Sequence, residues 1–173
     1  MLFSRKYHSP IGMLTIVSSD SHLEGLWIEG QKYFLSTLTE VPTPQENQPI
    51  LRLVTEWLDQ YFCGEKPDPF LLPLAPSGSA FRQRVWKLLC EIPYGNVVTY
   101  GELAKLLAKE EGKQHLSPQA VGGAVGHNPI SIIIPCHRVI GANGSLTGYA
   151  GGLEKKAWLL EHEGVALPFS PNP

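Results

Sequence analysis

A short apolar run between two prolines constrains this chain more than any other stretch. Residues 130–134 are Ile-Ser-Ile-Ile-Ile, with Pro129 before them and Pro135 after them. A run of this length bounded by prolines is typical of a buried extended segment, because helices are longer and rarely tolerate interior proline. We therefore expect a packed, extended segment that ends in a turn at Pro135.

The residues after Pro135 carry reactive groups. Cys136, His137 and Arg138 place a thiol, an imidazole and a guanidinium in consecutive positions. Thiolate is the nucleophilic form of cysteine, and a nearby base or positive charge favours it. Taken alone, Cys136 is better interpreted as a buried structural thiol, since free cysteine is among the most buried residue types. Its neighbours make it a candidate nucleophile.

Length and composition indicate an ordinary globular protein. The chain has 173 residues, 43% of them hydrophobic and 17% charged, which suffices for one domain or two small ones. No apolar run has membrane-spanning length, and the N-terminus lacks the pattern of a signal peptide. The cysteines, at positions 63, 90 and 136, have no metal-ligand spacing. We expect free thiols, a cytoplasmic location, no membrane association, and no metal or cofactor.

Charge is divided unevenly along the chain. Residues 1–78 hold five Lys or Arg and nine Asp or Glu, a balance of −4, whereas residues 79–173 hold nine and seven, a balance of +2. Phosphate binding depends on local charge. This asymmetry is compatible with a C-terminal half that binds DNA, but it is too small to indicate one by itself.

The N-terminal half has the pattern of a small α/β domain. Turn residues separate apolar strands within residues 2–30, which predicts an antiparallel meander. A polar, proline-rich loop is expected at 40–49, and helical spacing follows from Ile50 to Phe62. Residues 65–78 contain four prolines and mark the domain boundary. We place an N-terminal α/β domain at 1–75 and a second domain at 76–173.

The C-terminal half is predicted to be mostly helical. Helical spacing runs from Phe81 to Ile92, and Thr99 with Glu102 forms a capping box for a second helix. An exposed loop is expected at 109–116. A last helix begins near Leu153, and the tail 165–173 is expected to lack regular structure.

A further helix, beginning at Ser117 as N-cap and Pro118 at its first position, carries no bulky side chain. Its interior glycines, Gly122 and Gly123, each cost about 1 kcal/mol relative to alanine. Close approach of the helix backbone to another surface is one physical explanation, because it would offset the cost of the two glycines. The preceding helix, the loop and this short helix also form the outline of a helix-turn-helix, which alone is weak evidence for DNA binding.

Three segments together, 128–140, 148–152 and 158–164, resemble the O6-alkylguanine-DNA alkyltransferases, also called methylated-DNA–protein-cysteine methyltransferases. The match is near-continuous from about Phe81 to Gly164. The resemblance implies a ribonuclease H-like α/β N-terminal domain, with an antiparallel sheet plus helix. It also implies a mostly α, winged-helix-like C-terminal domain with a helix-turn-helix. The implied activity is irreversible transfer of the alkyl group of O6-alkylguanine, flipped out of double-stranded DNA, to Cys136, once per molecule.

The resemblance also assigns residue roles. It implies that His137 activates Cys136 through a water, that Glu163 orients the imidazole, and that Tyr100 donates to guanine N3. Tyr149, Ala150 and Gly151 would wall the alkylguanine pocket, within a loop whose small residues alone fit an ordinary flexible connection equally well. The implied DNA-binding residues are Gln119, Ala120, Gly122, Gly123, Ala124 and Asn128. Asn128 is equally compatible with simply ending a helix. Arg138 is expected to pair internally with a carboxylate.

Two features depart from the family pattern. Gln119 stands where the family usually has an arginine that replaces the flipped base, which predicts weaker extrusion or altered opposite-base preference. The 109–116 loop is longer than in the relatives. A monomer is expected, and cooperative assembly on DNA, acceptance of O4-alkylthymine and the range of adducts stay open.

Three other functions compete with this interpretation. A non-catalytic alkylguanine damage sensor is the main alternative, which Gln119 keeps open although Cys136 is present. A cysteine hydrolase needs an oxyanion hole, for which the sequence offers no motif. A helix-turn-helix regulator predicts an unreactive Cys136 and sequence-selective major-groove binding.

Overall fold

The computed structural model describes residues 1–166. The tail that was predicted to lack regular structure, 165–173, lies almost entirely outside this range. The chain folds into two compact units, one of residues 1–78 with 129–133 and one of 79–128 with 134 onward. The segment 129–133 joins the first unit because the Leu26 N–H donates to the Pro129 carbonyl at 2.9 Å and the Ser131 N–H to the Leu26 carbonyl at 2.8 Å.

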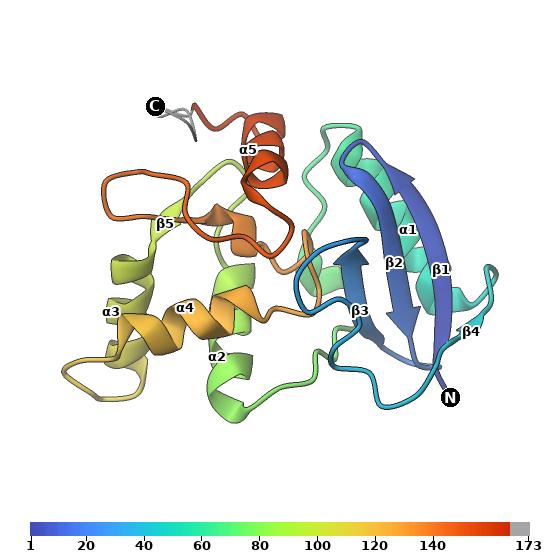
Figure 1. The fold of residues 1–173 in the computed structure, drawn as a ribbon, viewed down its shortest axis with the longest axis horizontal. Helices are drawn as coiled ribbons and strands as arrows, with labels where there is room; N and C mark the ends of the chain where they lie inside the picture. Colours follow the sequence, from blue (N-terminus) through green and yellow to red (C-terminus); the bar gives the residue numbers. More distant parts are fainter. Residues whose placement is uncertain (167–173) are drawn as a thin grey trace. The chain divides into compact units, whose positions relative to one another are not determined.

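The first unit is built on a four-stranded sheet (Figure 1). Strands β1 (Phe3–Ser9), β2 (Gly12–Ser18) and β3 (Leu23–Ile28) form the predicted antiparallel meander. Strand β4 (Thr43–Pro44) pairs parallel to β1 within the segment predicted to be a loop, so the sheet is mixed, in the order β3-β2-β1-β4. Its two residues are too few to leave a periodic pattern.

Helix α1 (Pro49–Phe62) covers one face of this sheet, as Figure 1 shows. Gln48 caps it by accepting a hydrogen bond from the Leu51 N–H, and Gly64 ends it at a φ of 90°. Each buried apolar side chain on its inner face contributes about 1.5 to 3 kcal/mol relative to exposure. These residues are Leu51, Val54, Trp57, Leu58 and Tyr61. A short 3-10 helix, η1 (Pro69–Leu71), lies in the proline-rich segment.

The second unit is mostly helical. Helices α2 (Ala80–Cys90), α3 (Tyr100–Glu110) and α4 (Pro118–Gly126) pack together, and the Trp86 indole N–H of α2 donates to the Ala124 carbonyl of α4 at 2.7 Å. The predicted caps are confirmed, since Thr99 accepts from the Glu102 N–H and Ser117 from the Ala120 N–H. Helix α3 continues to Glu110, so the exposed loop begins two residues later than predicted.

A small parallel pair of strands orders the rest of this unit. Strand β5 (Val98–Thr99) leads into α3 and pairs with β6 (Val139–Ile140), which follows the 3-10 helix η2 (Cys136–Arg138). This pairing brings the start of α3 alongside the segment that carries the candidate nucleophile. Helix α5 (Leu153–His162) begins where predicted and packs against η2, and Gly164 follows its end with a φ of 83°.

Candidate active site

The apolar run before Cys136 is buried but not extended. Two three-residue turns fold it, because the Ile133 N–H donates to the Ser131 carbonyl and the Cys136 N–H donates to the Ile134 carbonyl, each at 2.8 Å. Ile132, at the centre of the first turn, has a φ of 71°. That left-handed conformation is unfavourable for a β-branched residue. The prediction of an extended segment was therefore wrong in conformation and right in burial.

Asn128 holds the second turn in place. This residue follows α4, is buried, and donates from its side-chain Nδ2 to the Ile134 carbonyl at 2.7 Å. It thereby ties the end of α4 to the backbone that presents Cys136. Its amide also hydrogen-bonds the thiol group of Cys136, which favours the thiolate.

The Cys136 thiol is buried, at 6% exposure, and its environment acts in two directions. Burial raises the pKa of Cys136, because desolvation disfavours the thiolate. The Asn128 hydrogen bond and the positive charge of Lys156 oppose that increase. The net pKa lies above the ordinary value, so the resting group is the thiol, and a nucleophilic thiolate forms only with the help of a base.

His137 and Glu163 form a fully buried pair beside this thiol-bearing segment. The Nε2 atom of His137 lies 2.6 Å from Oε2 of Glu163. Burial alone would raise the pKa of Glu163, but the hydrogen bonds from His137 and Arg138 and the positive charge of Arg138 hold it well below its usual value. The carboxylate is therefore ionised and can only accept, so Nε2 carries the hydrogen.

The other imidazole nitrogen is left with its lone pair. Burial lowers the pKa of His137, with the Glu163 carboxylate opposing that effect, so the neutral ring prevails. Its Nδ1 atom is buried and has no hydrogen-bond partner among residues 1–166. A neutral imidazole whose basic nitrogen is unengaged can accept a proton.

Arg138 anchors the same carboxylate. Its Nε and Nη2 atoms donate to the two oxygens of Glu163 at 2.8 and 3.1 Å, and Nη1 donates to the Ile92 carbonyl at 2.7 Å. The Gly95 N–H adds a further hydrogen bond by donating to Oε1 at 3.2 Å. The expected internal ion pair of Arg138 is confirmed.

Lys156 interacts electrostatically with Cys136, and the sequence prediction missed it as a candidate site residue. It is fully buried on α5, and its ammonium donates to the carbonyls of Val139, Thr147 and Gly148 at 2.6, 2.9 and 3.1 Å. Burial lowers its pKa to about 8, while Cys136 opposes that shift. One signal could have found it: Lys156 lies three residues after Leu153 and four before Leu160, within the apolar stripe of the predicted helix.

Two tyrosines lie near the thiol. The Tyr100 hydroxyl, at the first turn of α3, donates to the Thr147 carbonyl at 3.2 Å, and burial together with Cys136 raises its pKa to about 12. Burial, Cys136 and Glu163 likewise raise the pKa of Tyr149. The Tyr149 hydroxyl is buried without a partner in the described part of the chain. Both therefore stay protonated at neutral pH and can donate.

The loop after β6 carries the other predicted pocket residues. Tyr149, Ala150 and Gly151 are half-buried, and the Gly152 N–H donates to the Tyr149 carbonyl at 2.9 Å, which closes a turn around them. Gly148, with a φ of 62°, lies close to Tyr100, since a Cβ built on it would be 3.5 Å from the Tyr100 hydroxyl. The loop thus brings the predicted pocket residues and Tyr100 together.

The predicted DNA-binding residues of α4 divide between its two faces. Gln119 and Ala120 are exposed, and Gly122 and Gly123 are half-buried, whereas Ala124 is buried at 2% exposure. A Cβ built on Gly122 or Gly123 meets nothing within 4 Å. Packing within the described chain therefore does not require either glycine. Within residues 1–166 there is no cluster of His, Cys, Asp or Glu fit to hold a metal, and no helix could cross a membrane.

Comparison with known proteins assigns both halves of the chain. Residues 2–76 match the family model described as 6-O-methylguanine DNA methyltransferase, ribonuclease-like domain, and residues 80–165 match the DNA binding domain of the same family. The methylated-DNA–protein-cysteine methyltransferase of Haemophilus influenzae is 40% identical over 95% of this chain and 87% of its own length. That of Methanosarcina acetivorans is 42% identical over 91% and 96%.

Solved structures agree with these matches. Mycobacterium tuberculosis OGT in complex with DNA is 42% identical, with a TM-score of 0.78, over 93% of this chain and 92% of that one. The M. tuberculosis O6-methylguanine methyltransferase gives 0.78 at 42% identity, over 98% and 97%. The chain therefore belongs to the 6-O-methylguanine DNA methyltransferase family.

Proposed function

We propose that this protein repairs DNA by moving the alkyl group of O6-alkylguanine to the sulfur of Cys136. The observation that carries the proposal is the buried, unengaged Nδ1 of His137 in the residue next to a buried thiol. In the reaction the bond between the alkyl carbon and O6 breaks and a carbon–sulfur bond forms. Attack at a saturated carbon suits a soft thiolate, and water has no easy route to cleave the resulting thioether. Each molecule therefore reacts once.

His137 is the base in this scheme and Glu163 its orienting partner. Because Glu163 fixes the hydrogen on Nε2, Nδ1 is free to take the thiol proton through a bridging water. Lys156 and Asn128 stabilise the thiolate once it forms, since both lower the pKa of Cys136. The ion pair with Arg138 keeps Glu163 ionised.

The leaving guanine needs a proton as it departs, because its anion is a poor leaving group. Tyr100 is the proposed donor, to guanine N3. Its hydroxyl, protonated at neutral pH, is held beside the loop that carries Tyr149, Ala150 and Gly151. That loop is the proposed wall of the alkylguanine pocket.

DNA binding is proposed to use α3 and α4 as a helix-turn-helix, with α4 in the minor groove. Support comes from Gly122 and Gly123, whose cost of about 1 kcal/mol each has no compensation within the described chain. A helix face without side chains lets a DNA backbone approach closely. Gln119, exposed at the start of α4, is proposed to take the place of the flipped base. The base must leave the stack, because its O6-alkyl carbon is unreachable within the duplex.

A non-catalytic damage sensor is the alternative, and a measurement of turnover separates the two. The test mixes the protein with excess duplex containing O6-methylguanine and follows repaired guanine by chromatography. Transfer to Cys136 predicts a burst that stops at one guanine per chain and disappears in Cys136→Ser. The matched variant Cys90→Ser, which changes another buried thiol of the same unit, should keep the burst. Tight lesion binding without a burst would establish the sensor instead.

A further inference from the structure

One buried cation fixes the start of the loop that carries the proposed pocket residues. The Lys156 ammonium has three hydrogens to donate, and all three are used, because it bonds to the carbonyls of Val139, Thr147 and Gly148 at 2.6, 2.9 and 3.1 Å. Val139 begins β6, whereas Thr147 and Gly148 begin the pocket loop, residues 147–152. Lys156 therefore ties the pocket loop to the strand that follows η2.

The Thr147 carbonyl is shared between Lys156 and Tyr100. It also accepts a hydrogen bond from the Tyr100 hydroxyl at 3.2 Å, so both of its lone pairs are engaged. Gly148 flanks the same hydroxyl, since a Cβ built on it would lie 3.5 Å from the Tyr100 oxygen. The Nζ atom of Lys156 is 6.0 Å from the centroid of the Tyr100 ring. One side chain thus holds the two backbone residues next to this hydroxyl.

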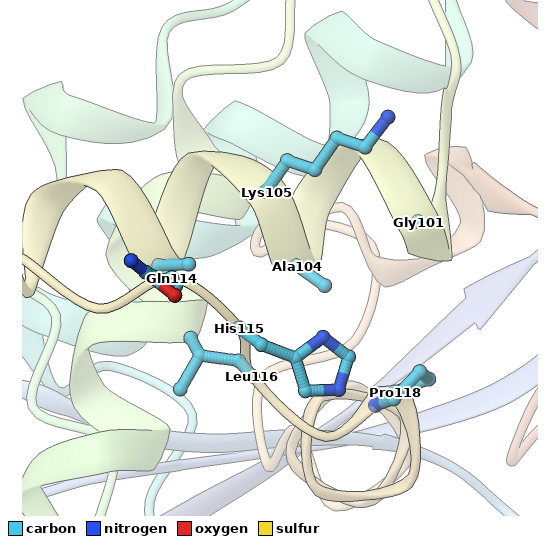
Figure 2. Close-up of a pocket in the computed structure, with 8 residues that line it drawn as sticks. Gly101, Ala104, Lys105, Gln114, His115, Leu116 and Pro118 are labelled. Carbon is cyan, nitrogen blue, oxygen red and sulfur yellow. The ribbon is translucent and has the colours of Figure 1, made fainter.

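Other polar side chains near the start of α3 do not orient Tyr100. A pocket of about 190 Å³ lies beside α3, and Tyr100 is not among the residues that line it. Figure 2 shows that the Lys105 side chain points away from Gln114 and His115, so the polar groups of this pocket do not converge. Within residues 1–166, the Thr147 carbonyl is the only hydrogen-bond partner of the Tyr100 hydroxyl. The direction of that hydroxyl therefore depends on how the carbonyl is held.

We propose that Lys156 is a positioning residue for Tyr100 and that it acts through the Thr147 carbonyl. Before guanine enters, the fixed carbonyl holds the hydroxyl in one direction. When guanine binds, the hydroxyl leaves the carbonyl and donates to guanine N3, while Lys156 keeps the carbonyl hydrogen-bonded. A carbonyl left without any donor would oppose this exchange, because an unreplaced hydrogen bond costs free energy. The inference rests on the proposed function, which assigns Tyr100 as the donor to the leaving guanine.

Two reactions of the same thiol separate this role from the effect of Lys156 on the thiolate. Alkylation of Cys136 by iodoacetamide needs the thiolate alone, whereas single-turnover methyl transfer at saturating duplex also needs the donor to guanine. Lys156→Met should slow transfer by about 10- to 100-fold more than it slows alkylation, because a misplaced catalytic group can lose about 100-fold in rate. In a Tyr100→Phe background this extra loss should disappear, so that Lys156→Met slows the two reactions by the same factor.

Asn128→Ala is the matched control, because Asn128 also lowers the pKa of Cys136 but donates to the Ile134 carbonyl instead of Thr147. It should slow transfer and alkylation by the same factor in either background.

Lys156→Gln provides a second variant, which also serves if Lys156→Met does not fold. It removes the charge and keeps two donors, so it should lose as much alkylation rate as Lys156→Met but less methyl transfer. An extra loss of transfer that persists in the Tyr100→Phe background, or no extra loss in either background, overturns this inference alone. If the unmodified chain transfers no methyl, the proposed function is overturned as well.

Discussion

Replacing Glu163 with glutamine removes one charge from a densely hydrogen-bonded group of the site and keeps its shape. The carboxylate accepts hydrogen bonds from His137, twice from Arg138, and from the Gly95 N–H. Glutamine offers one oxygen and an amide that is itself a donor. In Glu163→Gln, Arg138, a residue only 6% exposed, loses the carboxylate that balances its charge.

The expected loss of stability follows from that buried cation. Removing one partner of a buried ion pair costs about 3 to 5 kcal/mol. For a protein of this size the melting temperature should fall by about 6 to 20 °C. The effect also has a pH signature. The pKa of Glu163 is lowered by folding, so its ion pair stabilises above the unfolded value of about 4.3 and is lost as pH falls below it. Glu163→Gln should lack that part of the acid sensitivity.

Urea unfolding between pH 2 and 7, with single-turnover transfer measured at pH 7, tests both roles, because the contribution of Glu163 is lost only below about pH 4.3. Transfer should slow because a glutamine amide can either accept from or donate to Nε2 and so no longer fixes the hydrogen on that atom of His137. Glu161→Gln, an exposed glutamate of the same helix, is the matched control and should change neither property. A Glu163→Gln variant as stable as the original chain, with the same acid dependence, would refute the account of this ion pair.

Three further substitutions test separate parts of the site. Asn128→Ala should raise the pKa of Cys136, slow thiol alkylation by iodoacetamide, and destabilise by about 1 to 3 kcal/mol, because the buried Ile134 carbonyl loses its donor. Lys156→Met should also raise the pKa of Cys136 and cost about 3 kcal/mol, since three carbonyls lose their donor; unchanged thiol reactivity would contradict the assignment. Gly122→Ala should stabilise the chain by about 1 kcal/mol yet weaken DNA binding in a fluorescence anisotropy titration. Unchanged affinity would contradict the inference that the glycines of α4 let DNA approach the helix backbone.

Local patterns predicted most helices and the antiparallel meander. Thr99 and Ser117 have side chains that pair with backbone N–H groups three residues on, so helix starts are encoded within four residues. The same holds for the meander, where turns and alternating apolar residues fix the strands. Strand β4 was missed because its pairing with β1 is non-local and covers two residues.

The site itself was only partly predictable. Cys136 and His137 are adjacent in sequence, and the family resemblance supplied Glu163. Periodicity alone cannot show which side chains bind the same buried carboxylate. Ile132 illustrates the same limit, since a positive φ at a β-branched residue runs against its local preference and exists only because surrounding packing imposes it. Lys156 was missed because a lysine in an apolar stripe is ordinarily assumed to face solvent.

Residue-level localisation of the transferred group tests the central claim most directly. The protein would be reacted with one equivalent of duplex containing O6-methylguanine, digested, and its peptides sequenced by tandem mass spectrometry. We predict one methyl group, on the sulfur of Cys136, in an amount equal to the guanine repaired, with Cys63 and Cys90 unmodified. Repair with Cys136 unmodified, or a methyl group on Cys90, would contradict the assignment of Cys136 as the acceptor.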